Sequence, residues 1–405
     1  MKILSITAQK PHSTGSGTYL TELVKAFDEA GCKQAVVAGI YPDDHVCFPE
    51  GVDFYPVYFD ADSDSEASVS FPVVGMSDSM PYPSTKYSEM SEAMVSEFEE
   101  AFLKVAGEAI DLLEPDVILC HHLFLLTAII RKHFPDKKVY GICHGTDLRQ
   151  MINCPNLAEI VKPQIQKLDH IFALHEEQKN QIEEIFNIGQ ISVIGSGYNA
   201  KLFNTDGRGA TKAGELCRVC FAGKVSEAKG APELLDAIDK LNAEGGQKFE
   251  LLIAGGCQEE KLKAKLEGLP DNVTYLGMLP QTELSKIFKS CDVFILPSYY
   301  EGLGLVLIEA MASSLIPICT DLPGIRDWIN KNVANPNVRY IPMPEMAGVD
   351  TPTEAGRKKF TEDIKEILFD TINFVNNSKK ANEKLPLPDT SKITWLEVSK
   401  KILNL

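Results

Sequence analysis

Two carboxylates, Glu301 and Glu309, stand eight residues apart in a stretch that reads as a loop leading into a helix. The apolar run at 293–297 before them is typical of a buried strand that ends in a loop. Eight residues span a little over two helical turns, so we expect both acids on the same side of the element. The chemistry open to them is hydrogen bonding, because carboxylates accept hydrogen bonds from sugar hydroxyls.

Glycines between these acids indicate a site for an anion. Gly302 and Gly304 let the backbone approach a ligand closely, and the free N–H groups at a helix start attract phosphate. Two acids beside an anion site suit a sugar attached to a phosphate. The plainer alternative is a strand-to-helix turn with one capping acid and one surface acid.

A second segment places Lys224 and Lys229 between a strand and a helix, next to Gly223 and Gly230. Departure of a nucleoside diphosphate concentrates negative charge on two phosphates, and fixed cations would stabilise that charge. The neighbouring glycines favour phosphate contact over the alternative of two solvated loop lysines.

The spacing of Glu301 and Glu309 resembles the E-x7-E signature of the retaining GT-B glycosyltransferases of family 4, and the likeness extends along most of the chain. The resemblance implies that Glu301 contacts the hydroxyls of the transferred sugar and that Glu309 holds the ribose. It also implies that Lys224 and Lys229 hold the diphosphate. The family usually has an arginine at the position of Lys224, and lysine keeps the charge without the bidentate fork.

The same resemblance implies further contacts to the nucleotide-sugar donor. The backbone of Leu303, Gly304 and Leu305 would donate to the distal phosphate, as a helix N-terminus suggests independently. The other implied donor positions are Gly17, Gly255, Met278 and Leu279. Leu303 stands where the family often has an aromatic residue and Ser314 where it often has glycine. The base and the sugar therefore stay open, with a UDP-sugar favoured.

Polar residues also follow a strand predicted at 138–143. His144 begins the sequence His-Gly-Thr-Asp there, and this strand-end position favours function over the structural role that is commoner for a lone histidine. The resemblance gives His144 a contact to the sugar near its reactive carbon, beside the catalytic roles of Glu301 and Lys229. The neighbouring acid and base, Asp147 and Arg149, either contact the acceptor or form the first turn of a solvated helix.

Other features point to the acceptor side. Gly15, with Gly17, is predicted in the turn before a helix at 19–30, although the third glycine of a dinucleotide fingerprint is absent. His121 and His122 end another strand, and we expect His121 to pack and His122 to line a cleft.

Strands and helices alternate along the chain, which predicts parallel sheets with helices on both faces. We expect an α/β protein of two Rossmann-like, doubly wound domains with a cleft between them, the GT-B architecture that the resemblance implies. The N-terminal acceptor domain is predicted at 1–198 and the donor domain at 199–389, with a C-terminal helix at 390–405 that returns to the first. The stretch 41–87 is rich in Asp, Ser, Pro and aromatics, and we predict an irregular insertion that serves as an acceptor lid.

Composition narrows the class of protein. The 405 residues carry a net charge of −17, which argues against nucleic acid and anionic membranes as partners. No apolar run reaches membrane-spanning length, and the N-terminus reads as a strand rather than a signal peptide. Ten scattered cysteines suit reduced thiols in a cytoplasmic protein. Cys217 and Cys220 form one C-x-x-C without the second pair of a zinc site, so we expect no metal.

The sequence leaves three functions open. The first is a retaining transferase that moves a hexose or N-acetylhexosamine from a nucleoside diphosphate sugar to an acceptor hydroxyl, without a metal or other cofactor. Its acceptor is either a small soluble molecule or a cell-envelope or polysaccharide glycan. The second is a GT-B nucleotide-sugar epimerase, which would require further acid and base residues around the sugar. The third is an inactive sugar-nucleotide-binding partner subunit, and both a monomer and a homodimer are open.

Overall fold

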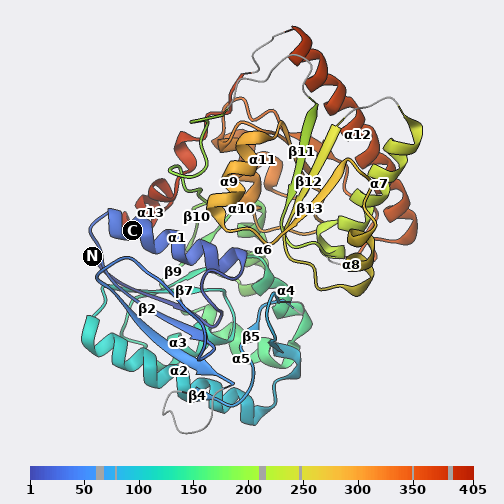
Figure 1. Cartoon of the computed structure of the whole chain (residues 1–405). Helices are drawn as coiled ribbons and strands as arrows, with labels where there is room; N and C mark the ends of the chain where they lie inside the picture. The colour runs from blue at the N-terminus through green and yellow to red at the C-terminus, as the bar shows by residue number, and fades with distance from the viewer. Residues whose placement is uncertain (61–67, 78–79, 209–215, 246–248, 349–350, 382–385) are drawn as a thin grey trace. The chain divides into compact units, whose positions relative to one another are not determined.

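The computed structural model describes the chain apart from residues 61–67, 78–79, 209–215, 246–248, 349–350 and 382–385. Contacts within the chain divide it into two compact units (Figure 1). The first unit comprises Met1–Gly197 and Trp395–Leu405, and the second unit comprises Tyr198–Thr394. The division falls one residue before the predicted junction at 198/199, and the return falls five residues after the predicted 390.

The chain returns to the first unit later than predicted because local hydrogen bonds hold the preceding segment. The hydroxyl of Thr390 donates to the Tyr198 hydroxyl at 2.9 Å, and the Asp389 N–H donates to the carbonyl of Ala334. These bonds keep the segment before Trp395, including the short 3-10 helix Ser391–Ile393, with the second unit.

The first unit is built on an eight-stranded sheet in which the neighbouring strands are parallel. Its strand order is β10-β9-β8-β7-β1-β2-β3-β4. The strands are β1 (Lys2–Thr7), β2 (Lys33–Ile40), β3 (Val52–Phe59), β4 (Ser68–Val69), β7 (Val117–His121), β8 (Val139–Ile142), β9 (His170–Ala173) and β10 (Ile191–Val193). The order runs outward from β1 in both directions, so right-handed crossovers place helices on both faces. Two short strands, β5 (Val74–Gly75) and β6 (Thr85–Lys86), pair separately.

The helices of the first unit cover this sheet (Figure 1). They are α1 (Gly15–Glu29), α2 (Glu92–Leu113), α3 (Leu125–His133), α4 (Thr146–Asn153), α5 (Pro155–Ile165), α6 (Glu176–Phe186) and α13 (Trp395–Leu403), with a 3-10 turn at Tyr87–Glu89. The C-terminal helix packs on α1, where the rings of Trp395 and Tyr19 lie 4.7 Å apart at 81°. Gly197 is required beside this contact, because an added Cβ would lie 2.6 Å from the Trp395 backbone nitrogen.

Two predicted elements of the first unit are wrong in detail. The first helix begins at Gly15 rather than at 19, because the Thr14 hydroxyl caps it by accepting from the Gly17 N–H at 3.0 Å. Both glycines therefore lie in the first helical turn. The predicted irregular stretch contains β3, a full strand paired with β2, whose alternation is obscured by Pro56 and by aromatics on both faces.

The second unit holds a six-stranded parallel sheet in the order β13-β12-β11-β14-β15-β16. The strands are β11 (Cys217–Ala222), β12 (Phe249–Ala254), β13 (Val273–Gly277), β14 (Val293–Leu296), β15 (Ile316–Thr320) and β16 (Arg339–Ile341). Chain order reverses between β11 and β14. In open parallel sheets, ligands bind outside the carboxyl ends of the strands at such a switch point.

The helices of the second unit connect these strands. They are α7 (Ala231–Glu244), α8 (Glu260–Glu267), α9 (Gln281–Ser290), α10 (Leu305–Ala312), α11 (Ile325–Asn332) and α12 (Glu354–Ala381), together with the 3-10 turn η2 (Glu227–Lys229). A buried ion pair anchors α12, because Lys379 Nζ contacts Asp292 Oδ2 at 2.7 Å and the Leu216 carbonyl at 3.0 Å. Across the described ranges, every helix is too short or too polar to cross a bilayer.

Candidate donor site and histidine cluster

The two charged segments singled out by the sequence meet at the switch point of the second unit. Lys224 and Lys229 follow β11, and Glu301 follows the adjacent strand β14. Lys229 Nζ contacts Glu301 Oε1 at 2.5 Å, with the two side chains 27% and 14% exposed. The fully buried Ser298 hydroxyl donates to the same oxygen at 2.7 Å. The second oxygen, Oε2, makes no hydrogen bond to the described residues and can accept one from a ligand.

Backbone contacts hold these loops together. The Tyr299 N–H donates to the Ala228 carbonyl at 3.0 Å, which ties the loop after β14 to η2. Gly230 adopts a φ of 65°, and an added Cβ would lie 2.1 Å from the Pro297 carbonyl oxygen. The close approach of the two loops therefore requires glycine here.

The loop after β12 approaches the loop after β11 most closely at two glycines. Gly223 and Gly255 have φ values of 149° and 148°, and a Cβ on Gly255 would lie 1.7 Å from the Gly223 carbonyl oxygen. The Gly255 N–H donates to the Gly277 carbonyl at 2.7 Å, which brings in the loop after β13. In that loop Met278 is 72% exposed and Leu279 is partly exposed. Three of the positions implied for the donor, Gly255, Met278 and Leu279, thus lie at one edge of the sheet.

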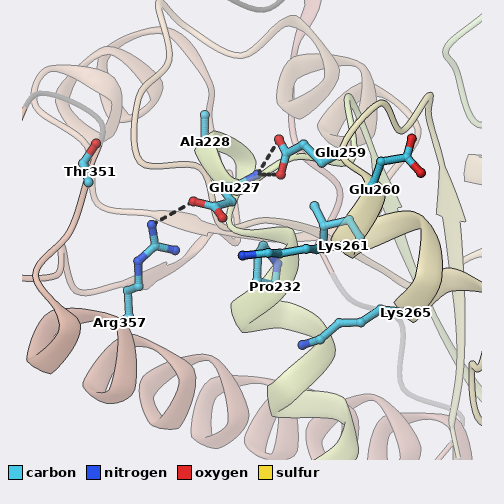
Figure 2. A pocket seen from close by; sticks show the side chains of 10 residues that line it. Glu227, Ala228, Pro232, Glu259, Glu260, Lys261, Lys265, Thr351 and Arg357 are labelled. Carbon is cyan, nitrogen blue, oxygen red and sulfur yellow. Dashed lines mark hydrogen bonds and ion pairs between the residues drawn. The ribbon is translucent and has the colours of Figure 1, made fainter.

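A charged pocket of 630 Å³ lies beside η2 (Figure 2). Its lining residues are Glu227, Ala228, Pro232, Glu259, Glu260, Lys261, Leu262, Lys265, Thr351 and Arg357. Both oxygens of Glu259 accept the Glu227 N–H, at 3.2 and 3.3 Å, and so cap η2. Arg357 contacts Glu227 Oε2 at 3.1 Å and the buried Glu233 at 2.8 Å, which links η2 to α7 and α12. These groups brace the lysine-bearing loop.

Lys224 lies near one acidic and one basic side chain. Burial lowers the pKa of its ammonium group, nearby Glu259 raises that pKa, and nearby Lys229 lowers it. The half-buried Lys224 side chain therefore lies within electrostatic range of Lys229. Their repulsion would be relieved by a bound diphosphate.

The helix α10 begins at Leu305 with an open N-terminus. Its N-cap is Gly304, in the left-handed region with a φ of 69°, and this glycine has no side chain that could cap the first turn. The first internal N–H bonds come from Leu307 and Ile308 to the Gly304 carbonyl, so the N–H groups before them can bind an anion. Leu303 is 3% exposed and can offer only its backbone.

The two acids belong to a loop and to the helix that follows it. Glu301 lies in the loop four residues before α10, whereas Glu309 lies inside the helix and is 6% exposed. Gln281 Nε2 donates to Glu309 Oε1 at 3.4 Å. The left-handed Gly304 marks the boundary between the loop and the helix. Ser314, just after this helix, has a φ of 60°, which explains why glycine suits the position.

The histidine predicted in the first unit belongs to a cluster of three. His121 ends β7 and His144 follows β8, and His121 Nδ1 lies 3.1 Å from His144 Nε2. His122 has a φ of 74°, and its ring centroid is 4.6 Å from that of His144. Burial lowers the pKa of His144 to about 3. Burial, then repulsion from His144, lowers the pKa of His121 and of His122 well below the ordinary value.

Asp147 is neither an acceptor contact nor part of a solvated turn, contrary to both predictions. It is fully buried and accepts from the Leu123 N–H at 2.8 Å and the His144 N–H at 3.2 Å. Burial raises the pKa of its carboxyl group, and these bonds oppose the rise. Asp147 therefore fixes the backbone after β7 and β8. His122, expected to line a cleft, is also buried, at 5% exposure.

The remaining predicted residues lie in α1, α4 and β11. Arg149 is partly exposed in the first turn of α4. Gly15 and Gly17 begin α1, and a Cβ on Gly17 would lie 2.8 Å from the Lys10 carbonyl. The thiols of Cys217 and Cys220 are buried on β11 and form no disulfide. Sequence reasoning missed Ser298, Glu259 and Arg357, and their only signal was proximity to loops already singled out.

Residues 208–341 match the family model described as glycosyl transferases group 1. This segment is similar to the group 1 glycosyl transferases. It runs from before β11 to the end of β16, and it contains both lysines and both glutamates of the candidate site.

Curated relatives align with part of the chain. The D-inositol 3-phosphate glycosyltransferase of Nocardia farcinica is 29% identical over 179 residues, 40% of this chain and 39% of that protein. The amylovoran biosynthesis glycosyltransferase AmsK of Erwinia amylovora is 31% identical over 154 residues, 36% and 37% of the two chains. The chain thus spans less than half the length of the curated relatives it matches.

Solved structures align with the whole chain. A sucrose-phosphate synthase from Thermosynechococcus elongatus has a TM-score of 0.68 at 16% identity, covering 100% of this chain and 98% of that one. WaaG, a glycosyltransferase involved in lipopolysaccharide biosynthesis, has a TM-score of 0.65 at 11% identity, covering 99% and 98%. At such identities the likeness concerns the fold alone. It confirms the predicted GT-B fold of two parallel-sheet α/β domains.

Proposed function

We propose that the chain is a retaining glycosyltransferase of the family 4 type. It moves a hexose or N-acetylhexosamine from a nucleoside diphosphate sugar, with a UDP-sugar favoured, to an acceptor hydroxyl without a metal ion. The observation that carries this proposal is the contact between Lys229 and Glu301 at the switch point of the second sheet, beside the open first turn of α10. A cation and free N–H groups suit a diphosphate, and the adjacent carboxylate suits sugar hydroxyls.

The proposed mechanism uses these groups for charge and position. Lys224, Lys229 and the first N–H groups of α10 stabilise the charge that develops on the departing diphosphate. Glu301 accepts from hydroxyls of the transferred sugar, and Glu309 accepts from the ribose. The acceptor hydroxyl attacks on the face from which the diphosphate leaves, and the departing phosphate oxygen takes its proton. No separate protein base is then required, and His144 contributes a hydrogen bond to the sugar.

The acceptor is proposed in two classes. The Nocardia relative is named for inositol 3-phosphate and the Erwinia relative for amylovoran biosynthesis, so a small phosphorylated acceptor and a polysaccharide both have support. A cytoplasmic site of action is consistent with ten cysteines, all within the described residues and none in a disulfide.

A panel of UDP-, GDP- and ADP-sugars tests the proposal directly. The purified chain is incubated with each donor, with and without EDTA, and release of nucleoside diphosphate is measured. We expect slow release from one class of donor, unchanged by the chelator, and faster release when the matching acceptor is added. The anomeric configuration of the product, read by NMR, should equal that of the donor.

Two outcomes would contradict the proposal. Interconversion of the donor sugars without release of nucleoside diphosphate would indicate an epimerase. Tight binding of one donor with no turnover, across the acceptor panel, would indicate an inactive sugar-nucleotide-binding subunit.

A further inference from the structure

His121 and His144 lie at the carboxyl ends of adjacent parallel strands, and their rings meet edge to edge. The register pairs His121 with Ile142, two residues before His144. The ring planes differ by 11°, and the centroids are 5.3 Å apart while the two nearest nitrogens are 3.1 Å apart. Those nitrogens therefore lie between the ring centres, in the geometry of an N–H···N hydrogen bond.

The direction of this hydrogen bond follows from what is buried. His121 Nε2 is buried and has no partner within the described residues. If that nitrogen carried the proton of His121, a buried N–H would be left without an acceptor, which folded proteins rarely tolerate. An unprotonated nitrogen at the same buried place costs less free energy than an N–H without an acceptor. The proton of the neutral His121 ring therefore belongs on Nδ1, where it is donated to His144 Nε2.

This assignment decides the protonation of His144. Its Nε2 is occupied as an acceptor, so the single proton of the neutral ring lies on Nδ1. Among the ring nitrogens of the three histidines, His144 Nδ1 is neither hydrogen-bonded in the described chain nor one of the buried unpartnered atoms. It is the nitrogen that a ligand can reach.

The ring of His144 is also held in place from other sides. Asp147 accepts the His144 backbone N–H, and the ring of Tyr19 packs edge-on against the imidazole at a centroid distance of 5.0 Å and an angle of 80°. Tyr19 is fixed in turn, because its hydroxyl donates to the Gly195 carbonyl at 3.0 Å. These contacts fix the position of the His144 ring, so His121 determines only which tautomer the ring adopts.

We infer that His121 is a positioning residue that locks His144 in the Nδ1–H tautomer, so that this N–H donates to a hydroxyl oxygen of the sugar substrate. The identity of that acceptor atom rests on the proposed function. The tautomer of His144 does not rest on the proposed function, so an experiment can refute either one without the other.

Long-range ¹H–¹⁵N correlation spectra of the full chain, labelled at histidine, report the tautomer of each ring. His144 is assigned from the signal lost in His144→Gln. The wild-type spectrum should show His144 with a protonated Nδ1 and a bare Nε2. His121→Asn, whose amide N–H can replace the Nδ1–H donor, should keep that pattern, whereas His121→Phe should shift His144 toward the Nε2–H form.

Transfer rates supply the second readout. The proposal expects His121→Asn to remain within about threefold of wild type, and His121→Phe to lose about tenfold in kcat/KM, the value of one ordinary hydrogen bond. An Nε2–H tautomer in the wild-type protein would overturn the inference, and so would an unchanged His144 signal in His121→Phe. Should His121→Phe fail to fold, the wild-type and His121→Asn spectra still decide. A correct tautomer in a chain that transfers no sugar would instead refute the proposed function.

Discussion

At the scale of single residues, the candidate site depends on one carboxylate oxygen of Glu301 that accepts from two donors. Glu301 Oε1 accepts from both Lys229 and Ser298, which leaves Oε2 for a ligand. The pair is partly neutralised before any ligand arrives, so the lysine does not carry a fully free charge. A diphosphate and a sugar would therefore compete with, or share, the existing contact.

Glu301→Gln should separate the two roles of this pair. The neutral amide releases Lys229, so we expect nucleoside diphosphate to bind as tightly as in wild type or up to about tenfold more tightly. The sugar loses a charged acceptor, so kcat should fall by about 10- to 100-fold. Titration calorimetry and steady-state rates measure the two effects. The control is Glu283→Gln, which breaks the exposed pair with Lys286 on α9 and should change neither. Equal kcat values for wild type and Glu301→Gln would refute the role of this acid.

The buried histidines should make the protein sensitive to acid. The pKa of His122 is lowered in the folded state, so the unfolded chain takes up a proton first as the pH falls below about 6.5. Folding stability is thus intact above this pH and declines below it. His122→Asn suits the left-handed backbone and removes this proton uptake.

Between pH 7 and pH 5, His122→Asn should lose up to about 2 kcal/mol less unfolding free energy than wild type. Urea titrations at several pH values measure the difference. The neighbouring His121 and His144 remain in the variant, so part of the decline should persist. The exposed His45→Asn serves as the control and should follow the wild-type curve. Parallel curves for wild type and His122→Asn would contradict this account.

At the scale of elements, glycines and buried polar groups set the positions of the loops. Gly223, Gly230 and Gly255 allow three strand-end loops to touch through their backbones. The long helix α12 is fixed to the same sheet by the buried pair of Lys379 and Asp292. Asp292 also accepts the Arg218 N–H at 2.9 Å, so it cannot leave its place when the lysine is lost.

Lys379→Met should therefore destabilise the second unit strongly. It leaves a buried carboxylate without its cation, which typically costs about 3–5 kcal/mol. The adjacent Lys380 is exposed, and Lys380→Met should stay within about 0.5 kcal/mol of wild type. Thermal and urea unfolding of both variants measure the contrast. A cost below about 1 kcal/mol for Lys379→Met would show that the pair does not hold α12.

The sequence predicted strands such as β8 and β14 because each is a short apolar run that ends at polar or glycine-rich loop residues. It placed Lys229 and Glu301 in loops that follow strands, and the structure shows that these strands, β11 and β14, are neighbours. It missed β3 because Pro56 interrupts the pattern, and it misread the start of α1 because glycines resemble a turn. The burial of Asp147 could not be predicted, since its partner Leu123 lies 24 residues away in the chain.

At the scale of the whole molecule, both units repeat one plan. Each sheet runs outward from a central strand, and each places its polar residues at the carboxyl edge next to the reversal of strand order. The first unit has its histidine cluster there, and the second has its lysines and glutamates. The chain is acidic overall, with a net charge of −17, so the anionic donor of the proposed function would depend on these local cations rather than on the field of the protein.

The central claim is that Lys229 binds the diphosphate of a nucleotide. Titration calorimetry with UDP, GDP and ADP in the presence of EDTA tests it, using wild type, Lys229→Ala and the exposed control Lys358→Ala. We predict that one nucleotide binds to wild type and to Lys358→Ala equally, and about 10- to 100-fold more weakly to Lys229→Ala. Equal affinity of all three proteins, or no binding of any nucleotide, would contradict the account.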